Sequence, residues 1–138
     1  MEKTKVRVLV VDDHRDTVDC FSMMLEMWGY TTATAFDGIT ALDIADSFDP
    51  DIVLLDLAMP EMDGLEVARR LRERGSLHPR YLVAVTGYGR PQDKIRAYEA
   101  GIECYLLKPV DEATLKAVLA RYGDKNLPVK MNAVSTST

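Results

Sequence analysis

The sequence is poor in the residues that build disulfide frameworks, soft-metal sites and membrane spans. It has 138 residues, of which only two are cysteine, two are histidine and one is tryptophan. Cys20 and Cys104 show no metal-ligand spacing, so we expect reduced thiols and no disulfide framework. No apolar run approaches the roughly 18 residues of a membrane-spanning helix, and no signal peptide is recognised. The predicted location is therefore the cytoplasm.

Positive charge is also in short supply. The formal net charge is -5 and the sequence pI is about 5.0. A protein that binds nucleic acid through its phosphates needs a basic face, so direct nucleic-acid binding is disfavoured. The 47% hydrophobic and 28% charged residues suit a globular protein with one core, and the length fits one domain.

Five short apolar runs alternate with five longer amphipathic stretches. Such runs are typical of strands that are buried on both faces of a parallel sheet. The runs are Val6–Val11, Tyr30–Ala35, Ile52–Leu55, Tyr81–Thr86 and Cys104–Leu107. This (βα)5 alternation predicts an α/β fold: a doubly wound, five-stranded parallel sheet with right-handed crossovers and helices on both faces.

The stretches between the runs carry apolar residues at spacings of three and four, as amphipathic helices do. These positions are Val18, Phe21, Leu25 and Trp28; Ile39, Leu42 and Ala45; Leu65, Ala68 and Leu71; Ile95 and Tyr98; and Leu115, Val118, Leu119 and Tyr122. Asp37 and Asp111 are predicted N-caps, and Pro91 is predicted to open the fourth helix. Gly29 and Gly101 mark predicted helix ends.

The alternating pattern stops at Gly123. The fifth predicted helix is expected to end at Gly123, and the third predicted helix is expected to end near Gly75. We therefore predict one domain over residues 1–123. Residues 124–138, which end in Ser-Thr-Ser-Thr, are predicted to be a disordered polar tail or linker.

Acidic residues stand directly after two of the predicted strands. Asp12 and Asp13 follow the first run, and Asp56 follows the third. In an open parallel sheet the functional crevice lies outside the carboxyl ends of the strands, so neighbouring first and third strands would bring three carboxylates together. Like charges raise one another's pKa unless a cation is present. Carboxylates without a histidine or cysteine ligand favour magnesium over zinc or iron.

Two further strand ends supply complementary groups. Thr86 offers a hydroxyl, and Gly87 leaves space beside it; Lys108, followed by Pro109, offers an ammonium group. A carboxylate nucleophile, a divalent cation, a hydroxyl and an ammonium group together form a phosphoryl-transfer site. Each residue alone has an ordinary explanation as a cap, a turn or a surface charge. Their joint occurrence at four strand ends favours a site.

Four segments carry a resemblance to the response-regulator receiver family of two-component signalling. They are VLVVDDHRD at 8–16, DIVLLDLAMPEMDG at 51–64, VAVTGYG at 83–89 and CYLLKPV at 104–110. The resemblance covers roughly residues 6 to 122. It implies the flavodoxin-like strand order 2-1-3-4-5.

The resemblance implies a role for each site residue. Asp56 would accept a phosphoryl group from a phosphohistidine on a sensor histidine kinase or phosphotransfer domain. Mg²⁺ would be held by Asp12 or Asp13, together with Asp56 and the backbone carbonyl of Ala58. Thr86 and Lys108 would contact the phosphoryl oxygens, and the Lys108–Pro109 peptide bond would often be cis.

Tyr105 matches the aromatic residue through which the family changes conformation. Phosphorylated Asp56 would draw the Thr86 hydroxyl inward, and the Tyr105 ring would turn into the vacated space. The face built from the fourth helix, fifth strand and fifth helix would then present a new surface to a downstream protein. The resemblance gives His14 no metal role. The chain is either a stand-alone regulator or the receiver segment of a larger hybrid kinase, and the phrases VDDHRDTVD and VTGYG resemble receivers that are fused to or paired with hybrid kinases.

Two other classes of function compete with a phosphorylation switch. An aspartyl-phosphate phosphatase or phosphotransferase resembling haloacid dehalogenases would carry a second Asp where this chain has Ala58, so we expect no enzyme beyond self-phosphorylation and self-dephosphorylation. A receiver-like docking domain that is not phosphorylated would have lost the acidic pair, the acceptor or the lysine. A flavin-binding protein of similar sheet order would need a phosphate-binding loop, and the sequence has none that we recognise.

Overall fold

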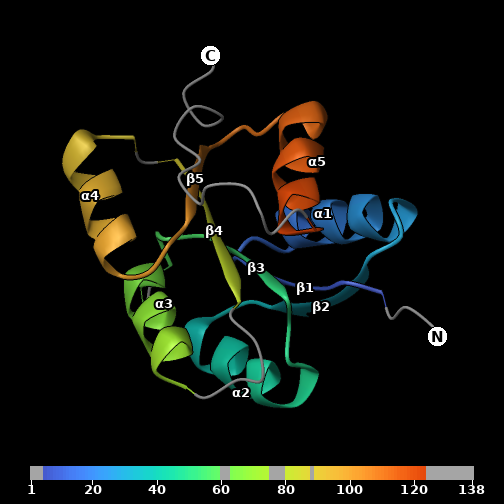
Figure 1. The fold of residues 1–138 in the computed structure, drawn as a ribbon, viewed down its shortest axis with the longest axis horizontal. Coiled ribbons are helices and arrows are strands. Elements are labelled where there is room, and N and C mark those ends of the chain that lie inside the picture. The colour runs from blue at the N-terminus through green and yellow to red at the C-terminus, as the bar shows by residue number, and fades with distance from the viewer. Residues whose placement is uncertain (1–4, 60–62, 75–79, 88, 124–138) are drawn as a thin grey trace.

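The computed structural model describes residues 5–59, 63–74, 80–87 and 89–123. Within these residues five strands form one parallel sheet in the order β2-β1-β3-β4-β5, as predicted (Figure 1). The strands are β1 (Arg7–Val11), β2 (Thr31–Ala35), β3 (Ile52–Leu55), β4 (Tyr81–Thr86) and β5 (Cys104–Leu107). The first two begin one residue later than the sequence indicated.

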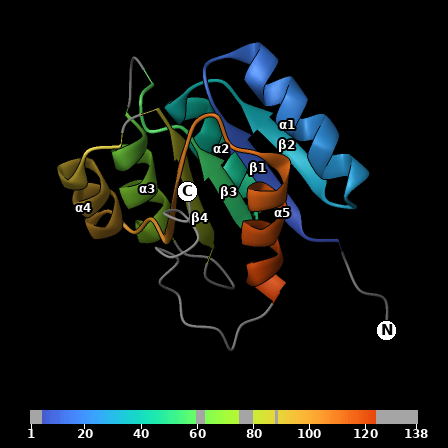
Figure 2. The same ribbon diagram turned by 90° about the horizontal axis from the view of Figure 1, so that it is seen from above.

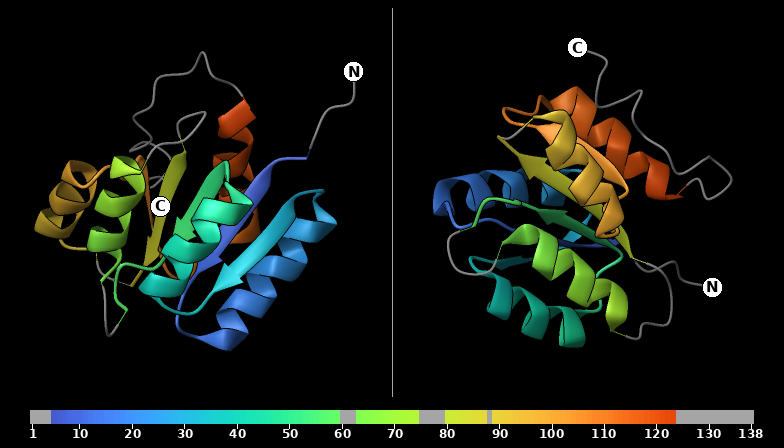
Figure 3. Two further views of the ribbon diagram at one scale, coloured as in Figure 1. Left: turned by 90° about the horizontal axis from the view of Figure 1, so that it is seen from below. Right: turned by 90° about the vertical axis from the view of Figure 1, so that its left-hand side faces the viewer.

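The described residues also form five α-helices, one after each strand. They are α1 (Arg15–Met27), α2 (Gly38–Phe48), α3 (Gly64–Glu73), α4 (Pro91–Glu99) and α5 (Glu112–Ala120), with a 3₁₀ turn, η1, at Arg121–Gly123. Figures 2 and 3 show α1 and α5 on one face of the sheet and α2 and α3 on the other, with α4 beside α3. None of the described helices is long and apolar enough to cross a membrane.

Each face of the sheet has its own hydrophobic core, because strand side chains alternate between the two faces. In β1, Leu9 and Val11 pack on the side of α2 and α3, whereas Val8 and Val10 pack on the side of α1 and α5. All four are at most 1% exposed. Burial on both faces explains the uninterrupted apolar character of the strands.

Capping residues fix where helices begin and end. The side chain of Asp37 accepts a hydrogen bond from Thr40 N (2.7 Å), and that of Asp111 accepts one from Thr114 N (2.7 Å). Both predicted N-caps are thereby confirmed, and Pro91 opens α4 as expected. Each such cap contributes about 1 kcal/mol to helix stability.

Two apolar residues assigned to helical stripes lie outside the packed faces. Ile39 is 61% exposed and Ile95 is 57% exposed. In α2 the predicted Leu42 and Ala45 are buried together with Ala41, and this buried face leaves Ile39 toward solvent. Helix α3 ends at Glu73; the predicted end near Gly75 and the predicted tail at 124–138 lie outside the described residues.

Candidate functional site

The pairing of β1 with β3 brings two aspartates to the same edge of the sheet. Val11 is the register partner of Leu55, and the backbone N–H of Asp56 donates to the Val11 carbonyl (2.9 Å). Asp12 and Asp56, the next residues along each strand, are 3% and 4% exposed. The predicted convergence of these carboxylates is therefore observed, in a largely buried setting.

Lys108 joins the two carboxylates. Its backbone N–H donates to the Thr86 carbonyl (2.8 Å), which anchors the residue just beyond β5. Its Nζ lies 2.7 Å from Oδ2 of Asp12 and 3.3 Å from Oδ2 of Asp56. The peptide bond to Pro109 is cis, as the family resemblance implied it would often be.

The second oxygen of each buried carboxylate is held by backbone groups of the loop that follows. Oδ1 of Asp12 accepts from the His14 backbone N–H (3.0 Å), and Oδ1 of Asp56 accepts from that of Ala58 (2.9 Å). These bonds from the backbone just after each strand orient both side chains toward Lys108.

Four residues offer ligand atoms that lie close enough to share one cation. Oxygens of Asp12, Asp13 and Asp56 and a ring nitrogen of His14 all lie within 4.8 Å of one another. His14 Nδ1 is 3.1 Å from Asp12 Oδ1 and 3.3 Å from Asp13 Oδ1, although the ring is 69% exposed. The sequence predicted no metal role for His14, although its position directly after the acidic pair was the available signal.

The residues present fit a hard divalent cation. Oδ1 of Asp13 is buried and accepts no hydrogen bond among the described residues; its contact there is the His14 ring nitrogen at 3.3 Å. Buried polar atoms normally have a partner, so this oxygen has an unused coordination position. Three carboxylates face a single lysine ammonium group, and Mg²⁺ prefers oxygen ligands of this kind. The cluster is typical of a magnesium site.

The two buried carboxyl groups have opposite pKa shifts. For Asp56, burial and then the charge of Asp12 raise the pKa, against the opposing effects of Ala58 N–H and Lys108. For Asp12, burial also raises the pKa, but hydrogen bonds from Lys108 and His14 outweigh it and the net pKa is lowered. Asp56 is therefore the carboxylate whose charge is less well compensated, as suits a nucleophile.

Thr86 and Tyr105 lie on neighbouring strands behind this cluster. Thr86 ends β4 and is fully buried, while Tyr105 in β5 is 1% exposed. Burial, followed by the charge of Asp93, raises the pKa of Tyr105 to about 12. The ring already lies within the core in this structure, so it needs no inward turn to become buried.

The loop after Asp56 packs tightly against the start of α3. A Cβ added to Gly64 would lie 2.5 Å from the Asp56 carbonyl oxygen and 2.6 Å from Leu57 Cα. The Gly64 N–H donates to the Leu57 carbonyl (3.2 Å), and the side chain of Asp63 caps α3 at Glu66 N (2.9 Å). The Asp63-Gly64 pair, which the sequence pattern alone would assign to a turn, thus joins α3 to the backbone of Asp56 and Leu57 (residues 56–59 are called the acceptor loop below).

Comparison with known proteins agrees with this geometry. The response regulator receiver domain family matches residues 8–120. The chain is 37% identical over 119 residues to the DNA-binding dual master transcriptional regulator RpaA of Synechocystis, covering 83% of this chain and 49% of RpaA. It is 39% identical over 116 residues to the response regulator MprA of Mycobacterium bovis, covering 84% of this chain and 48% of MprA. The chain thus spans about half the length of these relatives.

Solved structures give the same result for the fold. The chemotaxis protein CheY4 of Vibrio cholerae superposes with a TM-score of 0.82 at 29% identity, covering 86% of this chain and 99% of CheY4. A CheY-like receiver domain from Methanospirillum hungatei superposes with a TM-score of 0.80 at 25% identity, covering 89% of this chain and 98% of the Methanospirillum chain. The chain belongs to the response regulator receiver domain family, whose members are phosphoacceptors in two-component signalling.

Proposed function

We propose that Asp56 is the residue that accepts the phosphoryl group. The observation that carries this proposal is a carboxylate 4% exposed at the end of β3, with Lys108 Nζ at 3.3 Å and a second buried aspartate beside it. A carboxylate oxygen of Asp56 forms the new bond to phosphorus, while the bond from phosphorus to the imidazole nitrogen of the donor breaks. The product is an acyl phosphate.

Asp12, Asp13, Asp56 and the backbone carbonyl of Ala58 are the groups that would hold Mg²⁺. Bound there, the ion would neutralise charge shared by the carboxylates and the phosphoryl oxygens. Lys108 already bridges two carboxylates and can exchange one of them for a phosphoryl oxygen. Thr86, at the end of β4, supplies a hydroxyl donor to another oxygen.

Receiver domains are not enzymes in the usual sense, and we propose that this chain acts only on its own acyl phosphate. Turnover of other phosphoesters would need an acid beside the nucleophile. The side chain two residues after Asp56 is the methyl group of Ala58, which cannot donate a proton. The acid–base group of a phosphatase is therefore lacking at this position.

Receiver domains interact with histidine kinases, and the proposed donor here is a sensor kinase or phosphotransfer domain. The proposed output surface is the face of α4, β5 and α5, where Ile95 and Leu107 are 57% and 39% exposed. RpaA is described as DNA-binding, but this chain spans only half of it, and we propose no direct nucleic-acid contact for the receiver itself. The cytoplasmic location stays a prediction.

The proposed switch links the phosphoryl group to this face through Thr86 and Tyr105. Because the Tyr105 ring is already buried, we propose that phosphorylation fixes the ring in its inward position rather than moving it there. The phosphoryl group can shift this equilibrium only by the difference in its interactions with the two states.

Intact mass spectrometry tests the proposed acceptor. The chain is incubated with Mg²⁺ and a small acyl phosphate, and then compared with Asp56→Asn and with Asp43→Asn, which removes an exposed carboxylate of α2. We expect one added phosphoryl group on the wild type and on Asp43→Asn, none on Asp56→Asn, and none on any protein in excess chelator. An adduct on Asp56→Asn, or a wild-type chain that stays unmodified with a phosphorylated histidine kinase as donor, would contradict the proposal.

A further inference from the structure

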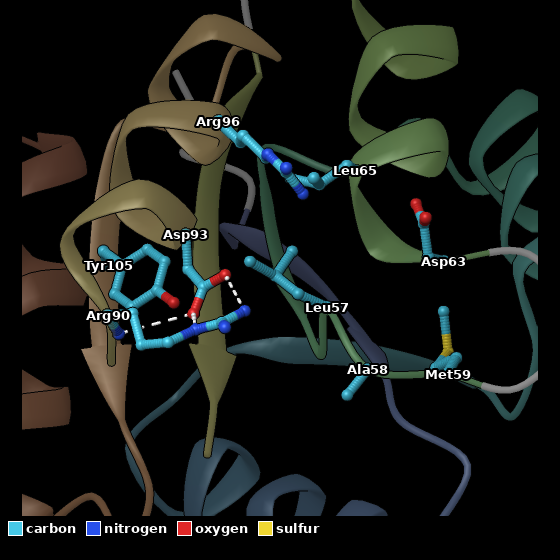
Figure 4. A pocket seen from close by; sticks show the side chains of 9 residues that line it. All are labelled: Leu57, Ala58, Met59, Asp63, Leu65, Arg90, Asp93, Arg96 and Tyr105. Atoms are coloured by element: carbon cyan, nitrogen blue, oxygen red, sulfur yellow. Dashed lines mark hydrogen bonds and ion pairs between the residues drawn. The ribbon is translucent and has the colours of Figure 1, made fainter. Parts of the chain in front are cut away.

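A second concave site lies beside the carboxylate cluster. This pocket, of about 440 Å³, is bounded by the β3–α3 loop, the start of α3 and α4 (Figure 4). Its volume falls within the roughly 300–1,000 Å³ that ligand sites occupy. Of the described residues, those of the carboxylate cluster and Lys108 do not line it.

The floor and one wall of the pocket are apolar. Leu57, Ala58 and Met59 line it from the acceptor loop, and Leu65 lines it from the first turn of α3. Figure 4 shows the Leu57 side chain directed into the space between the two helices. This surface suits the burial of one bulky apolar side chain.

The two acidic residues of the pocket are already engaged. Asp63 caps α3 by accepting from Glu66 N at 2.9 Å. Asp93 accepts from Nε and Nη2 of Arg90, each at 3.0 Å, and its side chain is 13% exposed. These carboxylates are therefore not available to a cationic ligand.

Arg96 is the remaining charged group of the pocket. Its side chain extends from α4 across the pocket toward Leu65 (Figure 4). Among the described residues no carboxylate lies within ion-pair distance of this guanidinium, and the residue is exposed. Among the described residues, the pocket thus combines an apolar floor with one guanidinium group at its rim that forms no ion pair, although its charge helps to lower the pKa of Asp93.

We propose that this pocket binds a peptide segment of a partner protein in which an acidic residue adjoins a bulky apolar one. The apolar side chain packs against Leu57 and Leu65, and the carboxylate pairs with Arg96. A protruding peptide fits better than a free metabolite because the charge stands at an exposed rim, whereas small-ligand sites bury most of the ligand and fix it with enclosed polar groups. This binding goes beyond the proposed phosphoacceptor function.

Titration of the ¹⁵N-labelled, unphosphorylated chain by NMR tests this site. The probes are acetyl-Phe-Glu-amide and acetyl-Phe-Gln-amide, which have the same shape and differ in charge. We expect the acidic peptide to shift the amide signals of Leu57, Leu65 and Arg96, and to bind about fivefold more tightly than the neutral one. Arg96→Gln is expected to abolish this preference. Arg69→Gln, which removes an exposed arginine of α3 paired with Glu66, is expected to keep it.

Three results would overturn the proposal. These are equal affinities of the two peptides for the wild type, the absence of signal shifts around the pocket, and an Arg96→Gln variant that keeps the charge preference. The experiment needs no phosphoryl group. Its failure would leave the proposed role of Asp56 intact, and a failure of phosphorylation would not affect the peptide result.

Discussion

The two ends of the sheet both carry buried charge, but they balance it differently. At the amino end, Arg80 Nη2 lies 3.1 Å from Asp49 Oδ1, and Arg7 Nη2 lies 3.8 Å from Asp49 Oδ2. Asp51 accepts from Arg7 N at 2.8 Å and from the Tyr122 hydroxyl at 3.2 Å. Both guanidinium groups therefore lie beside Asp49, whereas Asp51 is held by a backbone N–H and a hydroxyl; with two arginines and two aspartates, this set of residues is formally neutral.

At the carboxyl end, three carboxylates cluster with one ammonium group, which contacts Asp12 and Asp56, so the formal charge of this set is −2 when His14 is neutral. The protein has the means to pair such charges, since it does so at the other end of the same strands. Removing one partner of a buried charge pair is strongly destabilising, whereas a cluster with excess negative charge favours the binding of a cation from solution. This contrast distinguishes the functional end of the sheet from the structural end.

The largest expected loss of stability comes from removing a charged group at the amino end of the sheet. Arg80→Met removes a guanidinium group that is only 5% exposed and lies 3.1 Å from Asp49 Oδ1. We expect the free energy of unfolding to fall by about 3 kcal/mol, measured by urea denaturation. The matched control is Arg74→Met, whose partner Asp46 is 56% exposed; its cost should stay below about 1 kcal/mol. Similar costs for the two variants would show that the amino-end cluster contributes no more than a surface pair.

A smaller loss of stability is expected from adding a methyl group next to the loop that carries Asp56, at the carboxyl end of the sheet. Gly64→Ala places a Cβ against the backbone of Asp56 and Leu57, so the loop or α3 must shift, at a cost of about 2 kcal/mol in thermal or urea unfolding. Gly87→Ala is the matched control, because a Cβ there meets nothing within 4 Å. A tolerated Gly64→Ala variant would mean that the acceptor loop is not held against α3 as described.

Replacing an aspartate with asparagine should change the free energy of unfolding in opposite directions at the two ends of the sheet. In the presence of a chelator, Asp56→Asn removes a buried charge whose pKa is raised, so charge on Asp56 opposes folding at neutral pH. We expect its free energy of unfolding to rise by about 1 kcal/mol. Asp51→Asn removes an acceptor of two hydrogen bonds and should lower it by about 1 kcal/mol. Urea denaturation of both variants measures these changes. If the free energy of unfolding falls by the same amount in both, the charge imbalance at the carboxyl end is contradicted.

Thiol chemistry tests how closed the amino end is, without changing stability. Cys104 begins β5 there and is fully buried, and burial raises the pKa of its thiol to about 12. Its reactive thiolate is therefore scarce throughout pH 7–10. We expect iodoacetamide to label the exposed Cys20 alone in the folded chain, and both cysteines in denaturant, by peptide mass mapping. Labelling of Cys104 in the folded chain would show that this end opens to solvent.

The sequence predicted the functional end well because its residues follow easily recognised strands. Asp12 and Asp56 come directly after runs that are buried on both faces, and Lys108 follows another, so the ends of parallel strands brought them together. The strand order needed a family resemblance, since periodicity alone does not say which strands are neighbours.

Other features depended on packing that no local pattern encodes. Ile39 was assigned by its spacing to a stripe with Leu42 and Ala45; these two are buried as predicted, but Ala41 is buried in place of Ile39. The pocket beneath Arg96 exists only because α3 and α4 lie side by side, and the inward position of Tyr105 is a choice of rotamer. Neither is specified by the spacing of residues along one element.

The most direct test of the charge imbalance is a Mg²⁺ titration followed by chemical or thermal unfolding, without a phosphoryl donor. Mg²⁺ at about 100 times its Kd should raise the free energy of unfolding of the wild type by about 2.7 kcal/mol. Asp13→Asn, which removes the carboxylate with an unused buried oxygen, should lose most of this gain, whereas Asp43→Asn should keep it. A wild type whose stability does not respond to Mg²⁺, or an Asp13→Asn variant that gains as much, would contradict a magnesium site at the carboxyl end of the sheet.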